Sequence, residues 1–270
     1  MIEELVPDGL WERLAPLLPA AKPRPRLHHG RHRLDDRAAL AGIVFVLKHG
    51  VGWAHVPRQA LGVSGVTCWR RLREWTEAGV WPQLHEALLA ELRAQGLLNL
   101  DEMSVDGSHV RALKGGRNVG PSPVDRGRAG SKHHLIVDAN GVPLQVTLTG
   151  GNRHDVTQLL PLVDTLPRIR GLVGRPRQKP RHLYADRGYD FDKYRRELRR
   201  RGITSHIARR GVAHGSGLGK KRWVVERGFA WLHHFKRLRT RYEIRDDLHL
   251  GLLKLACILI CYRKLPTTAF

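Results

Sequence analysis

A chain of 270 residues with 41% hydrophobic residues can form one large domain or two modest ones around a real core. Its formal net charge of +22 and pI of about 11 favour an anionic partner, above all nucleic acid, over the alternative of a merely basic solubilising surface. Three cysteines without a CxxC pair exclude a disulfide framework and indicate a reduced, cytoplasmic protein, and the apolar run 248–262 is too short to span a membrane.

The first third of the sequence is expected to be helical. Residues 8–18 have the pattern of a short amphipathic helix, and a linker rich in proline and positive charge follows at about 19–33. That linker can be a basic arm lying along DNA or a plain solvated connection. Residues 35–95 then read as helices, the first of which is apolar and ends at Gly50.

A basic helix is predicted after Ser64, whose side chain can cap it. Apolar residues recur in this helix at helical spacing, namely Val66, Trp69, Leu72 and Trp75. The opposite face carries Arg70, Arg71 and Arg73. Two helices joined by a turn, the second of them basic, are compatible with docking in the DNA major groove, so Arg70 and Arg71 are candidate DNA-binding residues. A packing or dimerisation module is the alternative.

From residue 97 the pattern changes to alternating strands and helices. Two strands flank the turn Ala139-Asn140-Gly141, a typical hairpin signal. The predicted order is strand, strand, strand, helix, strand, helix, strand, helix. This order indicates an α/β fold, a ribonuclease-H-like mixed sheet flanked by helices, in a domain at 97–270. A small all-helical domain at 1–96 is expected to precede it.

Three separated acidic residues stand out in this basic background. Asp106 and Asp186 each end a short apolar run, Asp106 directly before Gly107 and Asp186 two residues before Gly188, whereas Glu226 lies in a long basic helix. An aspartate at a strand end is usually a turn or capping residue when it stands alone. Two such carboxylates together with one from a helix can hold a pair of divalent cations, which activate water and stabilise an oxygen leaving phosphorus.

The helix that contains Glu226 supplies candidate phosphate contacts. Four residues spaced by 4, 7 and 4 should share one of its faces, namely Arg222, Glu226, His233 and Arg237. An acid flanked by cations suits a metal ion beside bound phosphates, and a surface ladder of ion pairs is the alternative. From residue 168 to 247 the chain has 24 Lys and Arg against 8 Asp and Glu, so positive charge gathers around two of the three acids.

Two further motifs give weaker signals. Lys132 opens a strand that should lie beside the Asp106 strand, where it is either a phosphate contact or a solvated edge lysine. His154 and Asp155 begin a helix, and a capping role is favoured over metal ligation.

The chain resembles the DDE transposases of insertion-sequence family five, which are related to those of family four. The matching stretches cover nearly the whole chain: GVGWAHVP, WRRLREWTEAGVWPQL, VDGSHVRA, GSKHHLIVDANGVPL, GGNRHDVTQLLPLVD, LYADRGYD, GITSHIARR and KRWVVERGFAWLHHFKRLRTRYE.

The resemblance implies a DNA transposase that cleaves the ends of an insertion sequence and joins them to target DNA by hydrolysis and transesterification. The family's catalytic, metal-binding acids carry over to Asp106, Asp186 and Glu226. Two Mg²⁺ ions, which Mn²⁺ can replace, are the implied cofactor. The implied partners are the terminal inverted repeats and target DNA, bound by a homodimer or larger assembly at the nucleoid, with no membrane.

Two positions depart from the family signature. Related transposases have Tyr three residues before the arginine and Lys or Arg seven residues after the glutamate, where this chain has Gly219 and His233. Histidine contacts phosphate more weakly at neutral pH, and Lys236 and Arg237 stand about one turn further on as substitutes. A DNA-binding derivative without catalysis and a stand-alone metal-dependent nuclease are the alternative functions.

Overall fold

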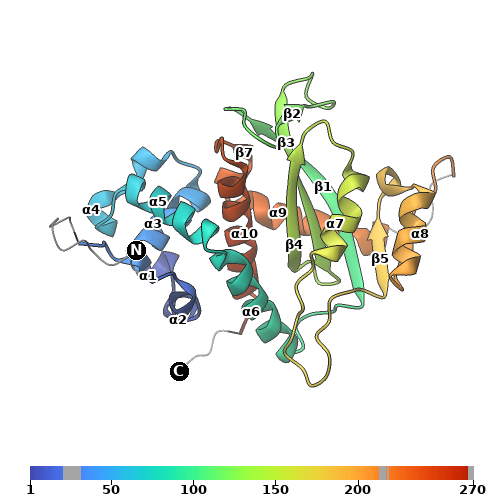
Figure 1. Cartoon of the computed structure of the whole chain (residues 1–270), viewed down its shortest axis with the longest axis horizontal. Coiled ribbons are helices and arrows are strands. Elements are labelled where there is room, and N and C mark those ends of the chain that lie inside the picture. The colour runs from blue at the N-terminus through green and yellow to red at the C-terminus, as the bar shows by residue number, and fades with distance from the viewer. Residues whose placement is uncertain (21–31, 213–216, 218, 267–270) are drawn as a thin grey trace.

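The computed structural model describes residues 1–20, 32–212, 217 and 219–266, and sets a layer of helices beside a mixed sheet (Figure 1). Most of the predicted linker lies at 21–31, outside the described residues. The helical layer comprises α1 (Ile2–Leu5), α2 (Asp8–Leu14), η1 (Ala15–Leu17), α3 (Asp36–His49), η2 (Trp53–His55), α4 (Arg58–Leu61), α5 (Gly65–Glu77) and α6 (Val80–Ala94).

Capping residues define the ends of the longer helices. The Asp35 carboxylate accepts the backbone N–H groups of Arg37 and Ala38 at the start of α3, and Gly50 ends that helix in the left-handed conformation with φ of 73°. The Ser64 hydroxyl accepts the N–H of Thr67 at 3.3 Å, which confirms the predicted cap of α5.

The inner face of α5 differs from the predicted stripe at one position. Leu72 and Trp75 are buried as expected, but Val66 is 58% exposed. Gly65 takes the inner place, because a Cβ there would lie 1.7 Å from the carbonyl oxygen of Trp53. The first turn of α5 therefore packs backbone against backbone on η2, and Val66 faces outward.

The mixed sheet has the strand order of a ribonuclease-H-like fold. Its strands are β1 (Glu102–Ala112), β2 (Gly120–Pro121), β3 (Ala129–Asp138), β4 (Pro143–Gly150), β5 (His182–Ala185), β6 (Thr204–Ile207) and β7 (Thr240–Arg241). The strands β4, β3 and β1 pair antiparallel in that order, and β5 and β6 continue from β1 in parallel. The predicted fold class is thereby confirmed.

The predicted hairpin joins β3 to β4. The buried Asp138 carboxylate accepts the backbone N–H groups of Asn99, Asn140 and Val142 at 2.8–3.0 Å, and Gly141 adopts a φ of 79°. Burial raises the pKa of Asp138 to about 6 even with these three donors.

Helices cover both faces of the sheet. One face carries η3 (Asp155–Gln158), α7 (Leu159–Asp164) and α8 (Asp192–Arg200), with η4 (Arg187–Tyr189) at the end of β5. The other face carries α9 (Gly219–His234), η5 (Lys236–Leu238) and α10 (Asp246–Tyr262). A Cβ on Gly228 of α9 would lie 2.9 Å from the Val137 side chain, so this helix lies close against β3.

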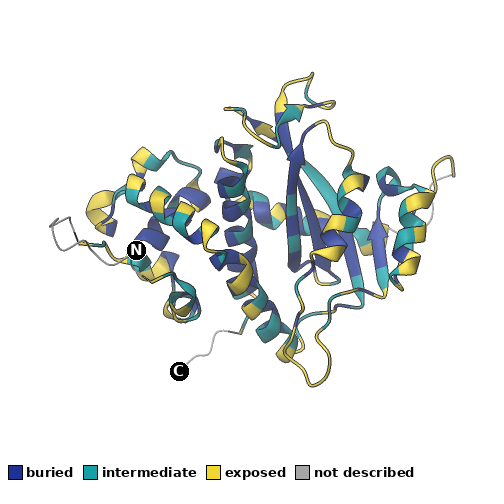
Figure 2. Cartoon of the chain, viewed as in Figure 1, coloured by how far each residue is buried: buried dark blue, intermediate teal, exposed yellow. Residues whose placement is uncertain are grey.

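Helix α10 stands between the sheet and the helical layer (Figure 1). It packs on β4 on one side and on α5 and α6 on the other. Figure 2 shows buried residues running through α10 and the central strands, and the buried apolar side chains form one continuous cluster. Among the described residues, no helix is long and apolar enough to cross a membrane.

The contact between α3 and α5 gives a test of the packing. A Cβ on Gly42 would lie 2.3 Å from Cys68 Sγ. Gly42→Ala should therefore lower the free energy of unfolding by about 1–3 kcal/mol in urea denaturation. Adding Cys68→Ala removes the sulfur, so the double variant should lose less than the two single losses combined. Simple additivity would contradict this contact.

Candidate active site

The two predicted aspartates come together at the pairing of β1 with β5. Ser104 lies opposite Tyr184 in this parallel register. Asp106 and Asp186 each follow two residues later, so they come level on neighbouring strands. Asp186 sits just past the end of β5, whereas Asp106 lies within β1, which continues to Ala112. The sequence expectation of two converging carboxylates is met, although Asp106 is not at a strand end.

Asp106 has an unusual electrostatic environment. Its Oδ1 accepts the N–H of Gly107 at 2.8 Å, and its Oδ2 lies 3.4 Å from an Arg222 guanidinium nitrogen. Burial, together with the negative charges of Asp186 and Asp155, raises the pKa of Asp106 to about 6, against the opposing effects of Gly107 N–H and Arg222. The carboxylate is therefore easy to protonate in the free protein, and a cation beside it would favour its ionised form.

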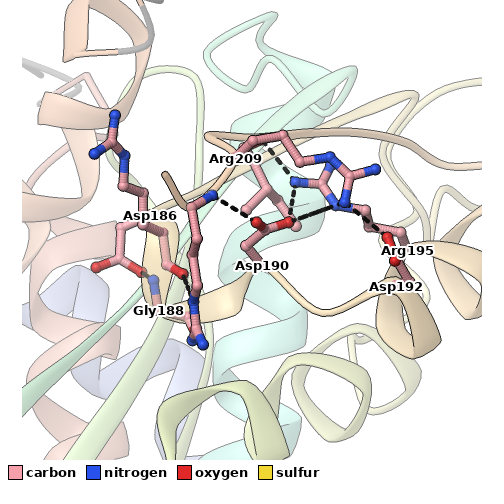
Figure 3. Close-up of polar contacts among 9 residues, drawn as sticks. Asp186, Gly188, Asp190, Asp192, Arg195 and Arg209 are labelled. Atoms are coloured by element: carbon pink, nitrogen blue, oxygen red, sulfur yellow. Dashed lines mark hydrogen bonds and ion pairs between the residues drawn. The ribbon is translucent and has the colours of Figure 1, made fainter. Parts of the chain in front are cut away.

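Asp186 is oriented by the turn that follows it. Its Oδ1 accepts the N–H of Gly188 at 2.8 Å and so caps η4. Figure 3 shows Asp190, a few residues on, facing Arg195 and Arg209. Arg195 contacts Asp190 at 2.6 Å and donates to the Ile207 carbonyl, which ties the turn to β6. A buried ion pair thus fixes the segment that presents Asp186.

Helix α9 brings Arg222 into contact with Asp106. Arg222 contacts Asp106, and Glu226 follows one turn later, about 6 Å further along the helix. The Glu226 residue is exposed to solvent. Among the residues that the structure describes, no three His, Cys, Asp or Glu side chains are arranged to hold a metal ion. The structure therefore brings Asp106 and Asp186 level with each other, and Glu226 does not complete a three-residue metal-binding group with them among the described residues.

A buried tyrosine adjoins the pair. Tyr189 is 1% exposed, and its hydroxyl has no hydrogen-bond partner among the described residues. Burial and the carboxylates of Asp106, Asp155 and Asp186 raise its pKa well above 10, so it keeps its proton. The sequence reasoning missed this residue, and its only signal was its place in the stretch LYADRGYD.

The aspartate pair fits a divalent cation. Carboxylate oxygens are the ligands that Mg²⁺ and Mn²⁺ prefer. Burial is the largest cause of the raised Asp106 pKa, the charge of Asp186 adds to it, and a cation would offset both effects. Two of the three predicted ligands, Asp106 and Asp186, therefore suit the divalent metal that the family resemblance implies.

Two of the predicted phosphate contacts are constrained by their surroundings. Lys132 lies in β3 beside β1, as expected, but its ammonium group pairs with Asp155 at 3.0 Å and donates to the Arg153 carbonyl. His233 is half-buried and stacked on Phe229, and burial lowers its pKa. His233 is thus neutral at pH 7, and Lys132 is already ion-paired.

The prediction that Arg237 shares a face of the Glu226 helix is wrong. Helix α9 ends at His234, and Phe235 is extended, so Arg237 falls in η5 and points into the protein. It is buried and pairs with Glu243 at 2.7 Å. Arg237 is therefore a structural residue without access to DNA, whereas Lys236 is exposed.

Arg70 and Arg71 lie at a basic cavity of about 630 Å³ in the helical layer. It is lined by His32, Arg33, Leu34, Arg58, Gly62, Ser64, Val66, Thr67, Arg70 and Arg71. Arg71 is tied to Asp36 at 2.7 Å and to Glu74 at 2.9 Å, whereas Arg70 is exposed. The two arginines therefore differ, because one is fixed within the fold and the other faces solvent.

The chain matches known families over most of its length. A transposase DDE domain matches residues 100–261, and a putative transposase of the IS4/5 family matches residues 6–85. The putative transposase for insertion sequence element IS402 of Burkholderia cepacia is 63% identical over 147 residues, which are 54% of this chain and 70% of that protein. An uncharacterized 16.2 kDa protein of the same element and organism is 47% identical over 46% of this chain and 84% of its own length.

A solved structure, the Mos1 strand transfer complex, gives only a weak likeness. It is 14% identical, covers 89% of this chain and 81% of its own, and has a TM-score of 0.30. The family matches and the relative from Burkholderia cepacia are far more specific, and the two family matches together span the helical layer and the sheet with its aspartates. The chain belongs to the DDE transposases of the IS4/5 type.

Proposed function

We propose that this transposase cleaves the ends of an insertion sequence and joins them to target DNA with Asp106, Asp186 and Glu226 as its catalytic residues. The observation that supports this most is the level placement of Asp106 and Asp186 on paired parallel strands, with Arg222 of the Glu226 helix in contact with Asp106. The proposal includes two Mg²⁺ ions, which Mn²⁺ can replace, with Glu226 completing the site.

The chain's own residues prepare the site for a charged substrate. Bound divalent cations would activate the attacking water or hydroxyl and stabilise the leaving oxygen. Arg222 neutralises part of the Asp106 charge at 3.4 Å and is placed to contact a phosphate oxygen there. The Tyr189 hydroxyl stays protonated and is a buried donor near the carboxylates. The Gly188 N–H fixes the orientation of Asp186.

We propose that the basic side chains that remain exposed contact the DNA. Lys236 and Arg70 are free to reach phosphates, and His233 adds a neutral donor about two turns of α9 beyond Glu226. We propose the cavity at the start of α5 as the site for the terminal-repeat DNA, with Arg71 shaping its wall. Functionally, 1–96 would bind DNA and pair protomers, and 97–270 would catalyse.

The same proposal includes the assembly and its place in the cell. Two element ends must be held together before they are joined to one target, which requires at least two protomers. We therefore propose a homodimer or larger assembly on DNA, acting at the nucleoid in the cytoplasm.

Asp106→Ala tests the catalytic assignment. Losing a carboxylate that holds the cation should remove several kcal/mol of transition-state stabilisation, so Mg²⁺-dependent cleavage of an element end should fall about 10³-fold or more. Binding of the same DNA in a gel-shift assay should persist. Glu197→Ala, which removes a partly exposed carboxylate on α8 paired with Arg200 and Arg201, serves as the control and should cleave normally. Unchanged cleavage by Asp106→Ala would remove this residue from the site.

Pre-cut element ends supplied with a plasmid target separate the possible functions. A transposase should give joined products that depend on Asp106, Asp186 and Glu226. A stand-alone nuclease would hydrolyse DNA without joining it, and a DNA-binding derivative would do neither in Mg²⁺ or Mn²⁺.

The raised pKa of Asp106 predicts that its ionised carboxylate lowers the free energy of unfolding at neutral pH. A carboxyl group whose pKa rises from 3.8 to about 6 holds its proton better in the folded state, so the free energy of unfolding falls as pH rises from about 4 to about 6. In EDTA at pH 7, Asp106→Asn should therefore be about 1–3 kcal/mol more stable than the unsubstituted protein, and this gain should vanish below about pH 4. Urea denaturation at the two pH values measures it. If Asp106→Asn were less stable than the unsubstituted protein at pH 7, the ionised Asp106 carboxylate would not be destabilising.

Arg70→Ala tests the helical layer. Removing one phosphate contact should reduce by about 1 the slope of log K against log salt for a terminal-repeat duplex. Arg200→Ala, an exposed arginine on α8, is the matched control and should keep the original slope. Equal slopes for Arg70→Ala, Arg200→Ala and the unsubstituted protein would mean that Arg70 does not contact the DNA.

A further inference from the structure

A fourth acidic residue lies directly against the backbone next to Asp106. A Cβ on Gly107 would lie 2.7 Å from Asp155 Oδ1, so only glycine leaves room for this carboxylate. The Lys132 ammonium nitrogen lies 3.0 Å from Oδ1 and donates to Oδ2 at 3.2 Å. The same ammonium donates to the Arg153 carbonyl at 2.9 Å. The Lys132 ammonium group thus holds the Asp155 carboxylate in the position where it packs against Gly107.

Helix capping does not explain Asp155. The N-cap of η3 is His154, and no side chain makes a capping hydrogen bond there. The capping role expected from the sequence therefore falls away. The Asp155 carboxylate turns instead toward Lys132 and toward His134, whose Nδ1 is 3.7 Å away. His134 is fully buried and bound to the Thr149 hydroxyl at 2.7 Å, so this side of the cluster is fixed as well.

The position of Asp155 bears on the orientation of Asp106. The Gly107 N–H donates to Asp106 Oδ1 at 2.8 Å, so the direction of this peptide group sets the direction of the carboxylate. Asp155 packs on the other side of Gly107 and limits its movement toward η3. In addition, η3 contacts η4, the turn that presents Asp186. One short segment therefore supports both proposed catalytic aspartates.

We propose that Asp155, held by Lys132, is a positioning residue for Asp106 and acts through Gly107. This rests on the proposed catalytic role of Asp106. Asp155 takes a supporting place at the cation site and not that of a ligand, because its carboxylate is already paired with Lys132 and packs against Gly107. Lys132, predicted as a phosphate contact, becomes the partner that fixes Asp155.

Binding of Mn²⁺ to the protein without DNA tests the proposal. Asp155→Asn keeps the shape of the side chain but removes its charge and weakens the Lys132 pair. Loss of an outer-shell partner typically weakens metal binding 10–100-fold, and we expect a weakening in this range by electron paramagnetic resonance. Asp164→Asn is the matched control, because it breaks a carboxylate–arginine pair with Arg201 on the same side of the sheet, away from Gly107. It should bind Mn²⁺ normally.

Gly107→Ala gives a second, independent route to the same defect. The added methyl group would displace the Asp155 carboxylate, so this variant should also bind Mn²⁺ more weakly. The double variant should be little weaker than Gly107→Ala alone, because both changes act on one contact. Fully additive losses would overturn the coupling. If Asp155→Asn does not fold by circular dichroism, Lys132→Gln replaces it and should weaken Mn²⁺ binding in the same direction.

The outcomes separate this inference from the proposed function. Normal Mn²⁺ binding by Asp155→Asn, together with lost binding by Asp106→Asn, would overturn the role of Asp155 and leave the catalytic site standing. Normal binding by Asp106→Asn would instead contradict the catalytic site itself.

Discussion

The parallel pairing of β1 with β5 forces two carboxylates of like charge to lie level with each other, and much of the molecule serves that constraint. The Asp106 side chain is partly buried, at 23% exposure, and its raised pKa reflects both burial and the charge of Asp186. The pair persists because both strands are anchored by apolar neighbours, such as Val105 and Leu183, which are fully buried. Function here depends on a local arrangement that the surrounding fold must hold against repulsion.

The parts of this arrangement that sequence reasoning finds are local ones. Asp106 and Asp186 each follow a short apolar run that predicts a strand, and the parallel pairing of those strands brings them together. The cap at Ser64 and the turn at Gly141 were equally predictable, because hydrogen bonding and backbone conformation limit which residues fit there. The helix–strand order of the ribonuclease-H-like part follows from the same local signals.

The errors come from contacts between distant segments. Arg237 continues the helical spacing of Arg222, but α9 ends at His234 without a glycine or proline to mark its end, and the buried Phe235 that follows is extended. Lys132 finds its partner 23 residues away in Asp155. Asp155 itself has no distinctive pattern, since its role depends on the missing side chain of Gly107. Periodicity carries no information about such pairings.

Those distant contacts include a buried polar chain that links the helical layer to the sheet. Arg237 donates to the Val51 carbonyl and pairs with Glu243, and His249 lies 3.4 Å from Glu243. His249 in turn lies 2.8 Å from His133 on β3. Breaking a buried ion pair by removing one partner typically costs about 3–5 kcal/mol, so this chain fixes how the two layers meet.

Helix α10 also has a consequence for the order in which the protein can fold. It follows both layers in sequence yet fills the space between them, and His249 within it completes the polar chain. On the ribosome, the helical layer and the sheet must wait with their facing apolar surfaces uncovered until residues 246–262 emerge. The fixed arrangement of the two layers can therefore form only after residues 246–262 have been synthesised.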